Sequence, residues 1–240
     1  MNLVIDIGNS SSKVAVYDGQ RQLSVFRTAQ LTFDELEKIL HGRGIKSAIV
    51  SSVKELPPFI TPLLLSSVPY VHILSYRSKL PFRIEYETPE TLGTDRIAAV
   101  AGAFNLFPSS EVLVIDAGTA ITYDFLSNEV YKGGNISPGL GIRFRALNEF
   151  TGRLPLVARA DNFTFPGRNT NDSILAGVIT GVTYEINEYI RTFEKNIKDL
   201  KIFLTGGDSG FLKDKINHQF TYVPDIVIDG LNYILEYNAV

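Results

Sequence analysis

The 240-residue sequence contains no cysteine and no tryptophan, and it has only three histidines. The lack of cysteine excludes disulfides, thiolate metal sites and cysteine nucleophiles, and it is compatible with a reducing compartment. His41, His72 and His218 are isolated in the sequence and lack the spacing of metal ligands. We therefore expect them at surface or cap positions, and neither a thiol nor a histidine cluster is a candidate site.

Long apolar runs and clustered positive charge are also absent. No uninterrupted apolar stretch approaches the roughly 18 residues that span a bilayer, and Asp6 and Lys13 interrupt the first apolar run, unlike the pattern of a signal peptide. The formal net charge is -3, and the basic residues are scattered. We therefore expect a cytoplasmic protein with no membrane and no nucleic-acid partner.

Several familiar catalytic motifs are missing from the chain. There is no Gly-x4-Gly-Lys-Ser/Thr loop, no Gly-x-Gly-x-x-Gly after a strand, and no His-Arg-Asp or Asp-Phe-Gly motif. No histidine stands in a Ser-His-Asp setting near the serines at 10–12. These absences argue against Walker-type and dinucleotide-binding loops, protein kinases and serine hydrolases.

The opening segment, residues 3–18, is predicted to form a strand, a polar turn and a second strand. Glycine frees the backbone of this turn to approach a ligand, and short polar side chains supply hydrogen-bond donors. A turn of this kind suits a metal-bound polyphosphate, whereas the structural alternative is an ordinary hairpin. The turn residues are Asp6, Ile7, Gly8, Asn9, Ser10, Ser11, Ser12 and Lys13.

The same pattern recurs in the second half of the chain. Asp116-Ala-Gly118 again follows an apolar run, and a third glycine turn occupies residues 205–208. Asp6 and Asp116 could hold cations, because magnesium and similar ions prefer carboxylate and water oxygens. Alternatively, both aspartates brace neighbouring turns. The repeat predicts two duplicated α/β lobes, residues 1–108 and 109–240, with mixed sheets around a nucleotide cleft between them.

Helix signals support this organisation. Thr32 and Glu35 form a predicted capping box, Thr170 is predicted to cap a helix that runs to about Asn196, and residues 227–237 are predicted to form a helix that closes the second lobe. Residues 133–139 are expected to be a loop, and residues 75–93 to be irregular. The boundary between lobes is placed at 107–111.

A motif at the start of another predicted helix combines a carboxylate with a guanidinium. In Gly93-Thr94-Asp95-Arg96, Asp95 could act as a general base and Arg96 could stabilise developing phosphoryl charge. The structural alternative is an aspartate that caps the helix and an arginine on the surface.

Six segments together make the chain resemble the acetate kinase, sugar kinase, Hsp70 and actin superfamily, and more narrowly the type III pantothenate kinases. The resemblance runs nearly from end to end, and the spacing from Tyr86 to Arg96 and the second aspartate loop are its most specific parts. The matching segments are residues 6–10, 86–96, 116–122, 133–139, 150–155 and 167–170.

This resemblance implies RNase H-like lobes and ATP-dependent phosphorylation of pantothenate to 4'-phosphopantothenate, the first step of coenzyme A synthesis. It implies that Asp95 is the general base, that residues 6–13 and Thr119 contact ATP, and that Asp116 binds potassium or ammonium while Mg²⁺ accompanies ATP. It also implies a homodimer with acceptor sites at the subunit interface, where Thr170 serves the partner's site. The implied pantothenate-binding residues are Tyr86, Gly93, Thr94, Asp95, Arg96 and Thr170.

Two positions depart from the family pattern. Ser10 replaces the commoner threonine but keeps a hydroxyl, and Gly152 replaces alanine in a segment expected to pack near the site. The purine-binding residues are left open. Two alternatives remain at this point: another small-metabolite kinase of the same superfamily, and a nucleotide-binding regulator without catalytic activity.

Overall fold

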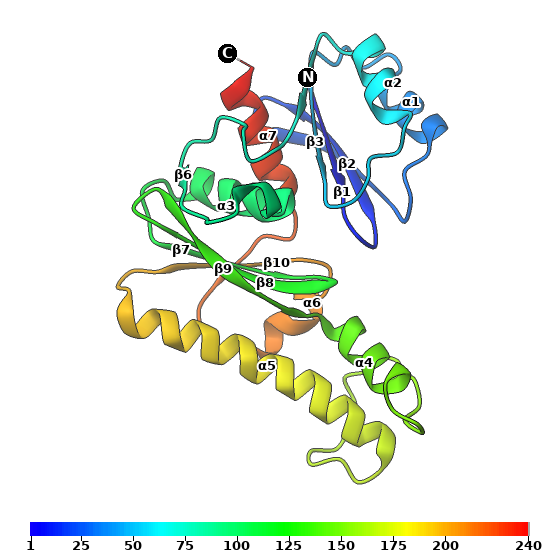
Figure 1. Ribbon diagram of the computed structural model, residues 1–240, viewed down its shortest axis with the longest axis vertical. Helices are drawn as coiled ribbons and strands as arrows, with labels where there is room; N and C mark the ends of the chain where they lie inside the picture. Colours follow the sequence, from blue (N-terminus) through cyan, green and yellow to red (C-terminus); the bar gives the residue numbers. More distant parts are fainter. Residues whose placement is uncertain (240) are drawn as a thin grey trace. The chain divides into compact units, whose positions relative to one another are not determined.

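The structure is a computed structural model that describes residues 1–239. Its first sheet has five strands in the order β3-β2-β1-β4-β5 (Figure 1). The strands are β1 (Asn2–Ile7), β2 (Ser12–Asp18), β3 (Arg21–Thr28), β4 (Ser47–Ser52) and β5 (Tyr70–Ile73). The hairpin partners β1, β2 and β3 run antiparallel, whereas β4 and β5 run parallel to β1. The sheet is therefore mixed, as the sequence predicts.

The register of the parallel pair determines which side chains meet at the sheet edge. Asp6 near the end of β1 lies opposite Ser51 near the end of β4. Apolar side chains of β1, β2 and β4 form one core with the helices α1 (Phe33–Leu40) and α2 (Ile60–Ser67). The capping box of α1 is confirmed, because Thr32 and Glu35 bond reciprocally. A rigid core thus holds Asp6 and Ser51 on neighbouring strands.

Two helices, α3 (Thr94–Leu106) and α7 (Ile226–Asn238), pack side by side (Figure 1). Their backbones approach closely where glycine faces backbone. A Cβ at Gly230 would lie 1.9 Å from the Ala98 carbonyl oxygen, and one at Gly102 would lie 2.3 Å from the Ile226 carbonyl oxygen. These positions require glycine, because a methyl group has no room there.

The second sheet repeats the strand order of the first. Its strands lie in the order β11-β10-β7-β8-β9-β6, so the order β9-β8-β7-β10-β11 matches β3-β2-β1-β4-β5. This correspondence supports the predicted duplication. The strands are β6 (Arg83–Ile84), β7 (Val112–Ala117), β8 (Ala120–Ser127), β9 (Val130–Pro138), β10 (Lys201–Thr205) and β11 (Thr221–Tyr222).

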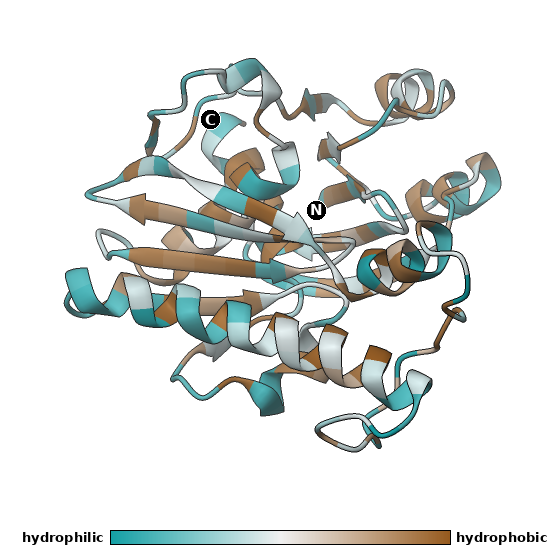
Figure 2. Ribbon diagram, turned by 60° about the horizontal axis from the view of Figure 1, so that its bottom comes forward, coloured by the Kyte–Doolittle hydropathy of each residue, from teal (hydrophilic) through white to brown (hydrophobic). Residues whose placement is uncertain are grey.

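The long helix α5 (Thr170–Asn196) supplies much of the core beneath the second sheet. Residues such as Val182, Ile186 and Ile190 pack with buried side chains of β7, β8 and β10. Figure 2 shows apolar residues along the strands and alternating polar and apolar residues along α5. The remaining helical segments are α4 (Leu140–Glu149), α6 (Ser209–Leu212) and two 3₁₀ turns, η1 (Pro89–Thr91) and η2 (Lys213–Lys215).

The described chain forms two compact units. The first contains Met1–Ser110, Phe125–Gly133 and the residues from Asp225 onward, and the second contains Glu111–Asp124 and Gly134–Pro224. The first break falls beside the predicted boundary at 107–111. The last helix, however, belongs to the first unit instead of closing the second, because α7 packs on α3, β1 and β4.

Three local predictions differ from the structure. The cap of α5 is Asn169 and not Thr170, because the Asn169 side chain accepts the amide of Asp172 at 2.9 Å. Residues 133–138 continue β9 instead of forming a loop. The segment 75–93, expected to be irregular, includes the short strand β6. Within residues 1–239, no helix combines the length and apolar character needed to cross a membrane.

Candidate functional site

Asp6, near the end of β1, is a buried carboxylate whose bonding is incomplete. It is 9% exposed, and its Oδ1 atom has no hydrogen-bond partner among the residues that the structure describes. Burial is the main cause that raises the pKa of Asp6 to about 6; the charge of Asp95 also raises it, whereas Lys13 and a hydrogen bond from Ser51 lower it. A buried carboxylate oxygen without a partner fits the ligand set of a divalent cation.

The turn after Asp6 is closed by a hydrogen bond from the Gly8 amide to the Ser11 carbonyl, at 3.0 Å. Asn9, Ser10 and Ser11 are exposed at its tip, and Ser12 is buried at the start of β2. The Ile7 side chain belongs to the core, so only its backbone is available to a ligand. The turn therefore presents backbone and short polar groups to solvent, as an anion-binding turn requires.

Lys13 lies on β2 beyond the turn and already faces a carboxylate. Its Nζ atom lies 3.4 Å from Asp225 Oδ1 just before α7, and Arg27 also donates to Asp225. Part of the positive charge predicted for the phosphate turn is thus balanced by Asp225. Nothing in the sequence pattern singles out Asp225, because it lies more than 200 residues from Lys13.

Ser51 connects the first turn to the start of α3. Its hydroxyl bonds to the Asp6 carboxylate and lies 3.0 Å from the Thr94 hydroxyl, and Thr94 also donates to the Ser52 carbonyl at 3.2 Å. Ser51 is absent from the residues predicted for the site, although its position near the end of a predicted strand is a signal of the right kind. Carboxyl ends of parallel strands meet at one sheet edge, where ligands commonly bind.

Asp95 lies in the first turn of α3 and accepts the backbone amide of Arg96 at 2.8 Å. The residue that caps α3 is Gly93, and a Cβ there would lie 2.5 Å from Asp95 Oδ1. Glycine at 93 therefore makes room for the Asp95 carboxylate. A partly buried carboxylate at a helix N-terminus has the position expected of a base held near its substrate.

Arg96 is buried beside two neighbouring tyrosine rings. Its guanidinium carbon lies 5.9 Å from the ring centre of Tyr86 and 6.0 Å from that of Tyr131, and the residue is 5% exposed. Such cation–π contacts fix a guanidinium without neutralising it. Tyr131 on β9 was missed by the sequence analysis, because its distance from Arg96 along the chain gives no local pattern.

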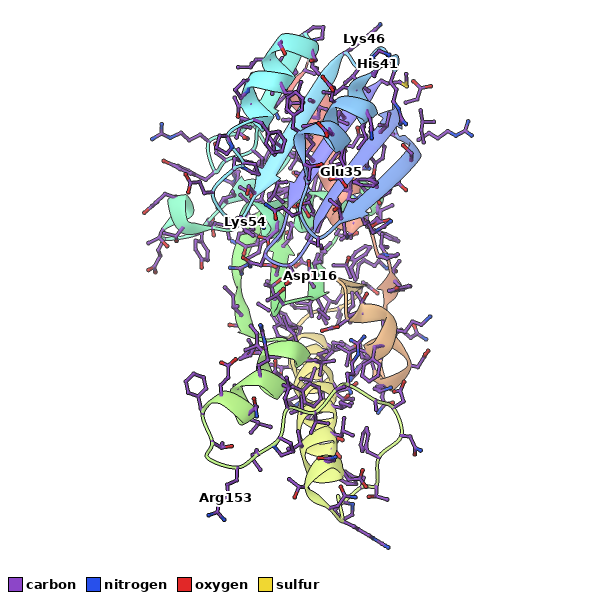
Figure 3. The ribbon with its side chains drawn as sticks, turned by 90° about the vertical axis from the view of Figure 1, so that its right-hand side faces the viewer. Glu35, His41, Lys46, Lys54, Asp116 and Arg153 are labelled. Carbon is purple, nitrogen blue, oxygen red and sulfur yellow. The ribbon has the colours of Figure 1, made fainter. Side chains whose placement is uncertain are left out.

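The second unit contains the second aspartate turn, where Asp116 is near the end of β7 (Figure 3). Gly206 has φ of +97°, and a Cβ there would lie 2.4 Å from Asp116 Oδ1. The amide of Asp208 donates to the Ala117 carbonyl at 2.8 Å. The two predicted glycine turns, 116–118 and 205–208, are therefore packed against each other.

Thr119 is partly exposed between β7 and β8. Its carbonyl accepts the Gly139 amide at 3.0 Å, just before α4. A Cβ at Gly139 would lie 2.1 Å from the Gly118 carbonyl oxygen. The turn that carries Thr119 is thus held against the start of α4.

Thr170 lies in a groove of the second unit between α4 and α5, with a volume of about 1020 Å³. The groove wall is mainly apolar and includes Leu147 and Val178, with Arg143 and Ser173 as polar members. Arg153 extends away from the loop that follows α4 (Figure 3). The predicted site residues thus divide between the two units: Asp6, Tyr86, Thr94, Asp95 and Arg96 belong to the first, and Asp116, Thr119 and Thr170 to the second.

Within the described part of the chain, no group of three or more histidine, aspartate or glutamate residues could hold a metal ion by itself. Asp6 and Asp116 each provide a single carboxylate. Such sites suit cations whose remaining ligands come from water or a nucleotide, as is usual for magnesium bound to phosphates.

Residues 2–192 match the family model described as Type III pantothenate kinase. Curated relatives with that name are similar over their full lengths. The Bacteroides fragilis protein is 42% identical over 239 residues, which is 99% of this chain and 98% of the relative. The Cytophaga hutchinsonii protein is 36% identical over 240 residues and both chains are covered completely.

Solved structures show a similar fold. A candidate Baf family transcriptional activator of Campylobacter jejuni has a TM-score of 0.62 and 25% identity, covering 99% of this chain and 98% of that one. The activator of 2-hydroxyisocaproyl-CoA dehydratase from Clostridium difficile, with bound ADPNP, has a TM-score of 0.55 and 12% identity. The match covers 99% of this chain and 93% of that one. The second likeness concerns the fold alone.

Proposed function

The chain belongs to the type III pantothenate kinase family, and we propose that it transfers the γ-phosphate of ATP to pantothenate, the step that opens coenzyme A synthesis. The observation that carries this proposal is the arrangement of Asp6 and Asp95. One lies at the phosphate-type turn and the other at the start of α3, and Ser51 and Thr94 connect them. One unit thus presents two charge-coupled carboxylates, for which we propose the roles of cation ligand and base.

In the proposed reaction, the Asp95 carboxylate accepts the proton of the terminal pantothenate hydroxyl as that oxygen attacks the γ-phosphorus of ATP. The bond from the γ-phosphorus to the bridging oxygen breaks, and ADP leaves. Arg96, held by Tyr86 and Tyr131, stabilises charge on the phosphoryl group or the acceptor. Positioning and electrostatic stabilisation supply most of the rate enhancement.

The ATP phosphates are proposed to bind to the backbone and hydroxyls of residues 6–13 and to Thr119. Asp6 would hold Mg²⁺, which neutralises phosphate charge when bound, and its unpartnered Oδ1 atom supports this assignment. Asp116 would hold a monovalent cation, potassium or ammonium. The carboxylate oxygens of Asp116 are the kind of ligand that a hard cation prefers.

Pantothenate is proposed to contact Tyr86 and the segment 93–96. Thr170 lies in the other unit, and we propose that it serves the acceptor site of a second copy in a homodimer. Exposed apolar side chains near the groove support a partner: Phe150 is 84% exposed and Phe165 is 66% exposed. We also propose that the enzyme acts in the cytoplasm, where ATP and pantothenate are available.

The dimer can be tested with Phe150→Asp, Phe165→Asp and the double variant. We expect a smaller sedimentation coefficient and a higher KM for pantothenate, because buried charge would oppose association. Lys198→Asp, on the loop after α5, changes the net charge by two units, as the double variant does, and is the control for that variant. A monomeric wild-type protein with full activity would reject the dimer.

The activity itself is tested by incubating purified protein with ATP, Mg²⁺, K⁺ and a panel of hydroxylated acceptors. Phosphorylation of pantothenate supports the proposal, and phosphorylation of a sugar but not pantothenate overturns it. ATP binding without turnover on any acceptor would favour a regulator, a reading to which the name of the Campylobacter jejuni protein gives some weight. The retained Asp95 argues against that reading.

A further inference from the structure

A polar network in the second unit is not explained by any role given above. Its centre is Glu185 on α5, whose carboxylate accepts hydrogen bonds from the Tyr123 hydroxyl at 2.8 Å, the Ser137 hydroxyl at 2.5 Å and Arg143 Nη2 at 2.5 Å. The three donors come from β8, β9 and α4. A single carboxylate on α5 therefore connects three other elements.

Glu185 is held in its charged form. Burial by itself would raise the pKa of Glu185, but hydrogen bonds from Ser137, Arg143 and Tyr123 outweigh it, and the pKa lies below its ordinary value. The side chains of Arg143 and Glu185 are 23% and 22% exposed. A well-shielded, multiply bonded ion pair is a rigid contact, unlike an exposed surface pair.

Arg143 also bonds to the backbone at the corner between β9 and α4. Its Nε atom donates to the Pro138 carbonyl at 2.7 Å, and its own amide donates to the Gly139 carbonyl at 3.1 Å. The guanidinium therefore bonds to Glu185 and to this corner at the same time. The planar fork of arginine permits both bonds, whereas a lysine ammonium cannot reproduce the geometry.

The corner at Pro138 and Gly139 also contacts the loop that carries Thr119. The Gly139 amide donates to the Thr119 carbonyl, and no side chain could fit between Gly139 and the Gly118 carbonyl. A displacement of Pro138 and Gly139 would therefore move the turn. Tight packing of this kind transmits small shifts instead of absorbing them.

We propose that Glu185 and Arg143 are positioning residues, which hold the Gly118–Thr119 turn in the shape that receives a phosphate group of ATP. This inference rests on the proposed role of Thr119 as an ATP contact. Neither residue is proposed to touch the reacting atoms. Their effect on the reaction passes through the 138–139 corner.

Hydrogen–deuterium exchange of the free protein tests the structural part without nucleotide. In Glu185→Gln, we expect amides of residues 118–121 to exchange about 10-fold faster, because the charge that fixes Arg143 is lost. Amides in the middle of β7 should be unchanged. The matched control is Glu188→Gln, which removes the same charge from an exposed pair with Arg191 on the same helix.

Steady-state kinetics and binding of a non-hydrolysable ATP analogue test the functional part. Glu185→Gln should raise KM for ATP and weaken analogue binding by about 10-fold, with a smaller change in KM for pantothenate, because misplacing a binding group by a fraction of an ångström weakens its contact. Glu188→Gln should match the wild type in every assay.

Arg143→Lys separates positioning from a general effect of charge. It also tests the proposal if Glu185→Gln does not fold. It keeps the positive charge beside Glu185 but loses the bond to Pro138, so we expect faster exchange at 118–121 with little change in melting temperature. Exchange at 118–121 equal to that of Glu188→Gln in the folded variants would overturn the proposal. Faster exchange with unchanged analogue binding would overturn the link to ATP, whereas a wild-type protein that does not bind ATP at all would reject the proposed function instead.

Discussion

The charge of Asp95 raises the pKa of Asp6. This coupling joins a residue near the end of β1 to one in the first turn of α3, and both belong to the same compact unit. Protonation of Asp6, or a cation bound to it, relieves the repulsion between the two carboxylates. The charge on one carboxylate therefore acts on the other, as expected if a cation ligand and a base serve the same reaction.

Replacing Asp95 with asparagine should lower turnover by roughly 10² to 10⁴, because the proposed base is removed. The fold should be retained, since an asparagine oxygen can still accept the Arg96 amide. Turnover is measured at saturating ATP and pantothenate, and the melting temperature and ATP affinity serve as controls for folding. Near-normal turnover in a folded variant would reject Asp95 as the base.

Asp6 should make the stability of the free protein depend on pH. The folded pKa of Asp6, about 6, lies above the ordinary value of 3.8. The contribution of Asp6 to the free energy of unfolding is therefore most favourable below pH 3.8 and is lost as the pH rises through 6. The difference corresponds to roughly 3 kcal/mol of lost stability above pH 6. Asp6→Asn should remove this loss.

Urea unfolding at pH 4.5 and pH 7.5, without nucleotide or divalent cation, measures this effect. The stability gained by Asp6→Asn relative to the wild type should be clearly larger at pH 7.5. An equal difference at both pH values would contradict the assignment. The same variant should lose most of its affinity for Mg²⁺ with ATP, since the proposed ligand is gone.

Ser51→Ala tests the connection between the phosphate turn and the acceptor helix. It removes a buried hydroxyl that bonds to Asp6 and contacts Thr94, so we expect a loss of about 1 kcal/mol in stability and a further rise in the pKa of Asp6. Turnover should fall by about 10-fold, because the turn that follows Asp6 and the start of α3 lose the contact through Ser51.

The neighbouring Ser52→Ala is the matched control for Ser51→Ala. The Ser52 hydroxyl bonds instead to the Lys54 carbonyl at 2.6 Å, away from Asp6. Equal kinetic effects of the two substitutions would show that the Ser51 contacts do not matter for the reaction.

Gly230→Ala should destabilise the protein by roughly 1–3 kcal/mol, because the new methyl group would overlap the Ala98 carbonyl. The shift of α7 would also move α3, which carries Asp95, so turnover should fall as well. Gly181→Ala on α5 is the control, since a Cβ there faces open space and alanine favours a helix. Thermal unfolding of the two variants should therefore change in opposite directions.

Local sequence patterns determined many of the elements. Apolar, β-rich runs predicted β1 and β2, the Thr32 and Glu35 pair predicted the start of α1, and a capping signal near residue 170 predicted a long helix that ends at Asn196, as α5 does. These features depend on neighbours within a few positions, where steric and hydrogen-bond preferences act directly. The two Asp-x-Gly turns similarly identified Asp6 and Asp116 and predicted the repeated topology.

Contacts between distant segments were decided only by the tertiary structure. Ser51 meets Thr94 across 43 residues, and Tyr131 meets Arg96 across 35, so no local spacing marks either pair. The sequence likewise placed α7 in the wrong unit, since its apolar face could cover either sheet. The close approach of Gly230 on α7 to Ala98 on α3 assigns α7 to the first unit.

The sequence by itself thus predicted which carboxylates, glycines and hydroxyls are candidates for the chemistry, because these residue types recur in the same order after two apolar strands. The tertiary structure decided how those residues are held. Asp6 is coupled to the charge of Asp95, Arg96 lies beside two tyrosine rings, and the Thr119 turn packs against a corner that Arg143 connects to Glu185. The physical reason is that side-chain identity is local, whereas burial, charge coupling and positioning arise only when distant strands and helices pack together.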